Sequence, residues 1–144
     1  MKKKILLFIS LIFLLILQLS KFYHQPCQGN RNLCFTTYVV KVIDGDTLET
    51  KNGIIRLSLV NAPEKNEEGF ELAKEFVEKF CLKKEIFVDV DDFQVKDIYG
   101  RWVAKVYCNG INLNEELVKN GLAKVNKIFC ENSEFAKESW TGCY

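Results

Sequence analysis

The chain has only one histidine among its 144 residues, His24, and it has no Cys-x-x-Cys pair. Structural and catalytic zinc sites are built mainly from histidine and paired cysteine ligands. The sequence therefore argues against a zinc protein. Internal repeats and low-complexity tracts are also absent, which leaves a single compact domain as the simplest arrangement for the length.

The chain also lacks the broad excess of positive charge that is typical of proteins that coat duplex nucleic acid. Its formal net charge is +1, from 20 basic and 19 acidic residues. Four of the basic residues lie in the first 24 positions, which hold no acidic residue, so the remainder has 16 basic and 19 acidic residues and a net charge of −3. Contact with nucleic acid must then be local, as in an enzyme that releases its product.

A long hydrophobic run is missing too, because the apolar stretch from Ile5 to Leu19 is only about 15 residues long. A full membrane span needs roughly 20, a length that extension to Tyr23 would provide. We expect residues 1–24 to be a membrane anchor or a secretory signal. The anchor is favoured because residues 18–20 make a poor cleavage site. A buried helix of a soluble domain is the alternative. The basic start should stay cytoplasmic, which places the rest of the chain outside.

Six cysteines follow that segment, and an even number of cysteines in an exported chain indicates disulfides. Free buried thiols are the alternative. The pairing that we expect first is Cys130 with Cys143, followed by Cys27 with Cys34, which leaves Cys81 with Cys108.

We expect residues 25–34 to form a stalk and residues 35–144 to form the domain. Residues 35–43, 47–50 and 54–60 alternate apolar and polar side chains and predict a three-stranded meander. Asp44-Gly45 is a hairpin-turn signal, because glycine takes positive φ at little cost. In the third strand we expect Ile55, Leu57 and Leu59 on one face and Arg56 and Ser58 on the other.

Beyond Pro63 the apolar spacing predicts a helix over residues 67–81, then strands over 85–91 and 102–108 separated by a polar loop. A capping box at residues 112–115 opens a further helix that stops at Gly121. Residues 133–139 are a candidate last helix. This order predicts a mainly β fold with helices: a five-stranded OB-type β-barrel with two to three helices, preceded by an N-terminal hydrophobic helix.

Two carboxylates and two arginines are the candidates for chemistry. Asp46 and Glu64 offer the hard oxygen ligands that divalent cations prefer. Arg56 and Arg101 carry guanidinium groups, which match phosphate geometry and stay charged. Each residue alone has a structural explanation, such as a turn, a solvated strand position or a helix start. Together they predict phosphodiester hydrolysis.

The motifs that carry these residues resemble the staphylococcal nuclease (thermonuclease) family over about Tyr38 to Phe129. They are Val42-Ile-Asp-Gly-Asp-Thr47, Arg56-Leu-x-Leu-Val60, Pro63-Glu64, Tyr99-Gly-Arg101 and Asn114-Glu-x-Leu-Val-x-x-Gly-Leu-Ala-Lys-Val125. The resemblance implies an OB-type barrel that cuts DNA and RNA with calcium.

The resemblance also implies a role for each site residue. Asp46 binds calcium, Glu64 positions or activates the attacking water, Arg56 and Arg101 bind the scissile phosphate, and Tyr99 lines the nucleotide pocket. Asn61 and Ala62 complete the calcium site, where the family has an aspartate and a threonine that gives its carbonyl.

Three departures follow from this correspondence. Asn61 removes one negative charge, so we expect weaker calcium binding. Ala62 keeps the carbonyl and is a mild change. Lys127 stands where the family has a nucleotide-stacking tyrosine, so we expect poorer base stacking.

The function predicted from the sequence is calcium-dependent, low-specificity hydrolysis of DNA and/or RNA by an exported or membrane-tethered nuclease. Its partners are the nucleic acid and, through the N-terminal segment, the membrane; no protein partner is inferred. A catalytically weak or inactive OB-fold module that binds nucleic acid or protein is the alternative, and Asn61 favours it. A disulfide-rich surface protein with a purely structural barrel is a third hypothesis.

Overall fold

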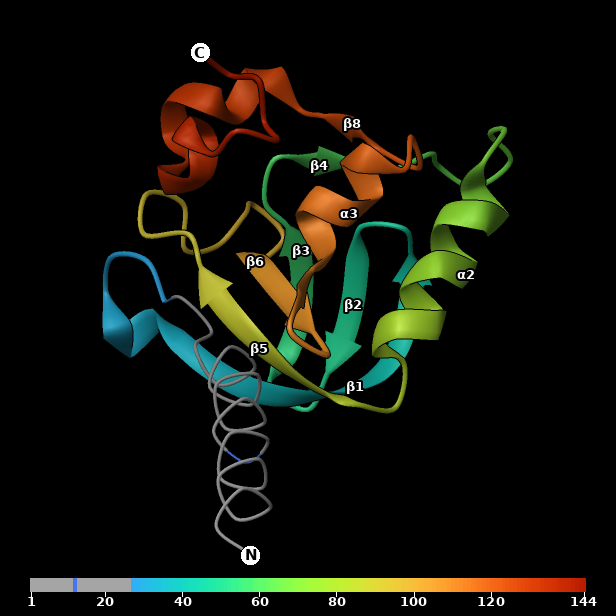
Figure 1. Ribbon diagram of the computed structural model, residues 1–144, viewed down its shortest axis with the longest axis horizontal. Coiled ribbons are helices and arrows are strands. Elements are labelled where there is room, and N and C mark those ends of the chain that lie inside the picture. The colour runs from blue at the N-terminus through green and yellow to red at the C-terminus, as the bar shows by residue number, and fades with distance from the viewer. Residues whose placement is uncertain (1–11, 13–26) are drawn as a thin grey trace, which may run out of the picture.

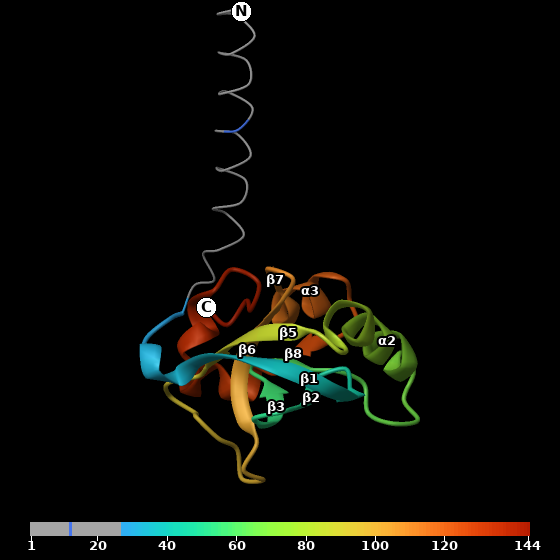
Figure 2. The same ribbon diagram turned by 90° about the horizontal axis from the view of Figure 1, so that it is seen from below.

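The structure is a computed structural model that describes residues 12 and 27–144 (Figures 1 and 2). The segment for which we expect an anchor or signal, residues 1–24, lies outside the described residues except for Ile12. Among the described residues, no helix has the length and apolar character needed to cross a membrane.

The elements are η1 (Arg31–Leu33), β1 (Cys34–Asp44), β2 (Thr47–Thr50), β3 (Gly53–Leu57), β4 (Val60–Asn61), α2 (Phe70–Cys81), β5 (Glu85–Val90), β6 (Trp102–Cys108), β7 (Ile111–Asn112), α3 (Leu113–Lys119), β8 (Lys124–Val125), η2 (Lys127–Asn132) and η3 (Glu134–Lys137).

Five strands close into a barrel, in the order β3-β2-β1-β5-β6, because β3 also pairs with β6. The closing pair is parallel and sets Arg56 opposite Val103, whereas the other pairs of the barrel are antiparallel. The short strands β4 and β8 form a separate pair beside the barrel. Figures 1 and 2 place α2 at one end of the molecule and the C-terminal segment at the other. The predicted five-stranded barrel with helices is confirmed.

The third predicted strand is shorter than expected and ends at Leu57. Ile55 and Leu57 lie in the barrel core, and Arg56 faces outward, as predicted. Leu59 does not continue the alternation, because its φ of 59° turns the chain. It packs instead in a second cluster with Phe135, so the expectation that it shares a face with Ile55 and Leu57 is wrong. This turn carries the chain out of the barrel and over to the C-terminal segment.

A glycine is needed at position 45 because no side chain would fit there. We expected instead that the turn would need a positive φ at this residue. Its φ lies outside the left-handed region, but a Cβ there would lie 2.7 Å from the Cβ atoms of both Ala62 and Ala73. The turn between β1 and β2 therefore packs directly on α2 and on the chain after β4. That close approach brings Asp46 next to Ala62.

Helices α2 and α3 form at the predicted places. The first begins at Phe70 instead of residue 67 because Gly69 has a φ of 90°, and it buries Ala73 and Val77 against the core. The second is capped by the Asn112 side chain, which accepts the N–H of Glu115, as the capping box predicts.

Asn114, in α3, is fully buried and holds β6 and the turn after β3 together. Its amide donates to the carbonyls of Ser58 (2.9 Å) and Ala104 (3.2 Å) and accepts the N–H of Val106 (3.0 Å). All of its polar contacts are with backbone groups, so this side chain fixes where the chain leaves the barrel.

All six cysteines are paired as predicted: Cys27 with Cys34, Cys81 with Cys108, and Cys130 with Cys143. Three disulfides suggest an oxidising, extracytoplasmic compartment.

Residues 27–33, for which we expect a stalk, lie on the barrel. The N–H of Gln28 donates to Asp89 (3.2 Å), its side chain accepts from Lys105 (2.7 Å), and the N–H of Asn30 donates to Asp92 (2.7 Å).

Candidate active site

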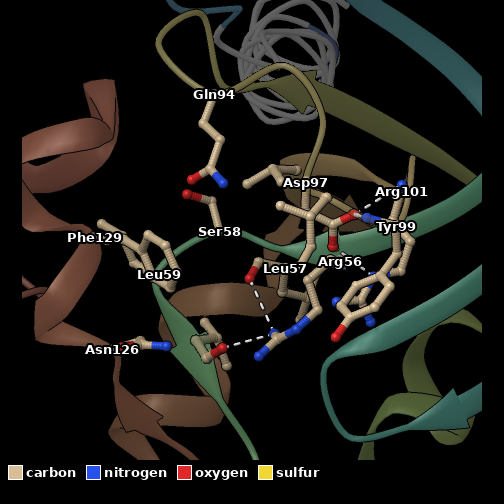
Figure 3. Close-up of a pocket in the computed structure, with 13 residues that line it drawn as sticks. Arg56, Leu57, Ser58, Leu59, Gln94, Asp97, Tyr99, Arg101, Asn126 and Phe129 are labelled. Carbon is tan, nitrogen blue, oxygen red and sulfur yellow. Dashed lines mark hydrogen bonds and ion pairs between the residues drawn. The ribbon is translucent and has the colours of Figure 1, made fainter.

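A pocket of about 280 Å³ lies on the outside of the β3–β6 seam (Figure 3). The ends of these strands supply its floor, including Arg56 and Val103. The loop between β5 and β6 supplies one wall, with Tyr99 and Arg101, and the C-terminal segment supplies the opposite wall with Phe129. Three residues predicted from the sequence, Arg56, Tyr99 and Arg101, therefore line one pocket.

Arg56 is held in place by three groups. Its Nη1 donates to the carbonyls of Leu57 (3.2 Å) and Val60 (2.7 Å), and its Nη2 lies 3.1 Å from Oδ2 of Asp46. Only 17% of the side chain is exposed. A guanidinium has five N–H groups, so these contacts leave donors available for an anion in the pocket.

Asp46 lies buried behind Arg56, on the turn between β1 and β2. Its Oδ2 accepts the N–H of Ala62 (2.7 Å), and its Oδ1 accepts the hydroxyl of Thr47 (3.1 Å). Burial raises the pKa of Asp46 to about 6; the Arg56 charge and the Ala62 N–H oppose this rise, while Asp44 adds to it. The ionised carboxylate is thus costly here, and a cation bound beside it would lower that cost.

Arg101 is positioned by Asp97. Its Nε lies 2.6 Å from Oδ2 of Asp97, whose Oδ1 accepts the backbone N–H groups of Tyr99 (2.9 Å) and Arg101 (3.0 Å). Burial alone would raise the pKa of Asp97, but these hydrogen bonds and the Arg101 charge outweigh it and lower the pKa. The Tyr99 ring lies 5.2 Å from the guanidinium carbon and is 77% exposed.

The other predicted residues do not line the pocket. Asn61 is exposed on β4 and pairs with Lys124 of β8, and Ala62 is buried with its N–H on Asp46. Glu64 is exposed, and its backbone N–H donates to the Glu67 carboxylate (2.7 Å). In the described part of the chain, its own carboxylate makes no hydrogen bond or ion pair.

The chemistry of the predicted ligand set fits a hard divalent cation, since it consists of a carboxylate, an amide oxygen and a backbone carbonyl. Asp46, Asn61 and Ala62 would supply these oxygens. Among the described residues, the one cluster of three acidic or sulfur ligands is Cys27, Cys34 and Asp89. Its two sulfurs are bonded to each other, so it is not a metal site.

Among the pocket residues that were not predicted as site residues, Asp97 and Phe129 matter most for the geometry of the site. The spacing of four between Asp97 and Arg101 was the available signal for the first, since such pairs meet in tight turns. Phe129 carries no local signal of its own. Lys127, where we expect poorer stacking, points away to the carbonyls of Thr141 (3.1 Å) and Gly142, so the aromatic wall of the pocket comes from Phe129 instead.

Comparison with known proteins identifies the family. A family model described as staphylococcal nuclease homologue matches residues 54–140. The chain belongs to the staphylococcal nuclease family, as the motifs predict.

Curated proteins with related sequences match most of this chain. An uncharacterized endonuclease of Haemophilus influenzae is 32% identical over 110 residues, which cover 73% of this chain and 58% of the relative. Endonuclease YncB of Bacillus subtilis is 29% identical over 124 residues, with 76% and 57% covered. An uncharacterized protein of Methanocaldococcus jannaschii, MJ1439, is 36% identical over 142 residues, with 72% and 69% covered. The chain spans little more than half the length of several relatives.

Proposed function

We propose that this protein is a calcium-dependent nuclease that hydrolyses phosphodiester bonds in DNA or RNA with little sequence specificity. The observation that carries the proposal is that Arg56 and Arg101 line one pocket, with the Asp46 carboxylate directly behind Arg56. The strand order of the barrel is that of OB-type folds, in which a barrel face binds oligonucleotides. The disulfides and the apolar N-terminal segment support an exported or membrane-tethered enzyme.

The two guanidiniums are proposed to bind the scissile phosphate. Each is fixed by contacts other than the substrate, so little reorganisation is needed when negative charge builds on the phosphate oxygens. Charge-assisted hydrogen bonds from such groups are about twice as strong as neutral ones. Asp97 keeps Arg101 aimed at the pocket, and Tyr99 and Phe129 are proposed to flank the nucleotide.

Calcium is proposed to be held by Asp46, Asn61 and Ala62, where it would supply the positive charge that polarises the phosphodiester. Glu64 is proposed as the general base that takes a proton from the attacking water. Its exposed carboxylate is free of other partners among the described residues, and Glu64→Gln should lower the rate by about 10²–10⁴.

The test is cleavage of labelled DNA and RNA by the full chain in detergent, with calcium and then with a chelator. Arg101→Ala should lower the rate by about 10²–10³. The control Arg31→Ala removes an exposed arginine that does not line the pocket, and it should leave the rate unchanged. Absence of calcium-stimulated cleavage between neutral and alkaline pH would rule the proposal out.

A binding module with weak or no catalysis is the second candidate, and two observations favour it. Asn61 supplies no charge to the metal site, and Glu64 does not line the pocket. Asn61→Asp separates the candidates: a large gain in calcium affinity and rate shows a weakened enzyme, while no cleavage by either form supports binding alone.

A further inference from the structure

The wall of the pocket that contains Phe129 belongs to η2, a six-residue 3-10 helix. Asn126, just before η2, lines the same wall, and Figure 3 shows both side chains across the pocket from Tyr99 and Arg101. The position of η2 therefore sets the width of the pocket.

Burial of apolar side chains does not hold η2 in place. Ile128 is 83% exposed and Phe129 is 38% exposed, and the one buried residue of the helix is Cys130. A 3-10 helix of this length has little stability of its own. The half-cystine is thus the main anchor of the helix.

Besides its contacts with η3, η2 is bonded to the few residues around the second half-cystine. Lys127 Nζ donates to the carbonyls of Thr141 (3.1 Å) and Gly142, and the Tyr144 hydroxyl lies 3.5 Å from the carbonyl of Cys130. The disulfide to Cys143 joins these two segments covalently. Thr141 is itself held to η3, because its hydroxyl donates to the carbonyl of Ala136 (2.7 Å), so opening the disulfide frees Cys143 and Tyr144 and leaves Cys130 without its covalent partner.

The chain on either side of η2 is held to the barrel independently. Before it, the N–H of Asn126 donates to the carbonyl of Leu59 (2.8 Å) next to the β4–β8 pair. After it, the N–H of Glu134 donates to buried Asp91 (3.2 Å), and Phe135 is fully buried. Loss of the disulfide should therefore free η2 while its two ends stay in place.

We propose that the Cys130–Cys143 disulfide positions the Phe129 wall, so that substrate binding at this site depends on the oxidation state of this one disulfide. The inference rests on the proposed function for its substrate. A thiol reductant gives up two electrons and two protons, the S–S bond breaks, both cysteines become thiols, and the reductant is oxidised to its own disulfide. Phe129 then loses its fixed place, and the affinity for the nucleotide falls.

Two of the three disulfides are accessible to a reductant, since Cys143 and both cysteines of the Cys27–Cys34 disulfide are partly exposed, and of these two only Cys130–Cys143 joins the pocket wall. Cys81 and Cys108 are buried in the barrel core, at 0% and 1% exposure, where a reductant has no access. Cys143 is partly exposed near the C-terminus. The third disulfide, Cys27–Cys34, holds the N-terminal residues and provides a matched control, since neither cysteine lines the pocket.

The experiment compares the full chain with the double variant Cys130→Ser/Cys143→Ser and the control Cys27→Ser/Cys34→Ser. KM for an oligonucleotide, and Kd for a nucleoside 3′,5′-bisphosphate with calcium, should rise about ten-fold in the first variant, as when one base–aromatic contact is lost. The value of kcat should change little, and the control should match the wild type. An unchanged KM and Kd in the first variant would overturn the proposal.

Phe129→Ala should raise KM by a similar factor, and adding it to the double cysteine variant should have no further effect, because both changes remove the same contact. Phe129→Tyr, which keeps an aromatic ring at this position, should have the same KM as the wild type. Full additivity of the two changes would contradict a shared cause.

Hydrogen exchange on the same proteins separates this proposal from the proposed function. Loss of protection confined to residues 127–132 in the Cys130→Ser/Cys143→Ser variant supports the positioning role even if the wild type cuts nothing. Equal protection in wild type and variant contradicts it even if the wild type is an active nuclease.

Discussion

The β3–β6 seam forms the floor of the pocket and the C-terminal segment, residues 126–144, forms one of its walls, but the two are built differently. The seam is part of a closed barrel, with Ile55, Leu57 and Ala104 buried in its core. The C-terminal segment has no strand beyond β8 among the described residues; it consists of two 3-10 helices, a small apolar cluster and a disulfide.

This difference separates two tasks. Arg56 comes from a strand and inherits the rigidity of the barrel, as a site that must place charge accurately requires. Phe129 comes from a short helix that one covalent bond holds, so the wall it forms can vary without disturbing the barrel. Arg101 lies between these extremes, because its loop is fixed by the Asp97 hydrogen bonds.

The largest expected effects distinguish the two arginines. Arg56→Ala and Arg101→Ala should each lower the cleavage rate by about 10²–10³. Arg56→Ala should also lower the free energy of unfolding by about 1–3 kcal/mol, because it leaves the buried Asp46 and the Val60 carbonyl without their partner. Arg101→Ala should leave stability nearly unchanged. Rates and urea denaturation measured on both variants check this, and equal stability of the two would contradict it.

The next effect tests whether the two regions unfold together. Leu57→Ala in the barrel should cost about 2–5 kcal/mol and Phe135→Ala in the C-terminal cluster about 3–5 kcal/mol. Both should keep a single transition, because Trp140 packs against both clusters. Thermal unfolding followed by near-UV and far-UV circular dichroism tests this. Two separate transitions in Phe135→Ala would show that the C-terminal segment is an independent unit.

Asp97→Asn should have a smaller effect on rate, about 10–100-fold, because misplacing a catalytic group by about 1 Å costs that much. The loss should appear mainly in kcat, and Asp97→Glu should recover part of it. Steady-state kinetics on both variants provides the measurement. A change in stability alone, with the rate intact, would show that Asp97 only shapes the loop.

The smallest effect concerns Glu134, which joins the C-terminal segment to the barrel by accepting the N–H of Asp92 (2.9 Å). Burial, followed by the charges of Asp92, Asp89 and Asp91, raises the pKa of Glu134 to about 7, against the opposing N–H of Asp92. The folded state thus binds a proton more tightly than the unfolded state, so stability falls as pH rises from about 4.5 to about 7.

Glu134→Gln should remove this part of the pH dependence. The melting temperature should rise relative to wild type at pH 8 and change least near pH 4.5. Thermal melts across that range measure the difference, and a constant difference between the two proteins at every pH would contradict the assignment.

Much of the fold was predictable because local signals agreed with tertiary packing. The strand Thr47–Thr50 and the Asn112 cap follow from alternation and capping chemistry. The disulfide pairing is the one expected first, although cysteine spacing alone does not determine it. Leu59 was not predictable, since its positive φ is set by the chain leaving the barrel and not by the residue itself. Gly45 was assigned to a turn for the wrong reason, because its close neighbours, Ala62 and Ala73, are distant in sequence.

The site shows the same limit. The sequence placed Arg56 and Arg101 in one site only because the family motifs that contain them occur in the expected order. The contact itself depends on the parallel pairing of β3 with β6, which no local sequence pattern encodes. Phe129 could not be identified because no local pattern shows that η2 lies across the pocket from the β5–β6 loop. The structure brings Arg56, Tyr99 and Arg101 to one pocket. The chemical roles of all the site residues, which are Arg56, Tyr99, Arg101, Asp46, Asn61, Ala62 and Glu64, stay predictions.

The most direct measurement is a crystal structure of the full chain with calcium and a nucleoside 3′,5′-bisphosphate. The account predicts one phosphate within hydrogen-bond distance of both Arg56 and Arg101, with calcium beside Asp46. A phosphate bound by neither arginine, or the two arginines directed at separate ligands, would contradict it.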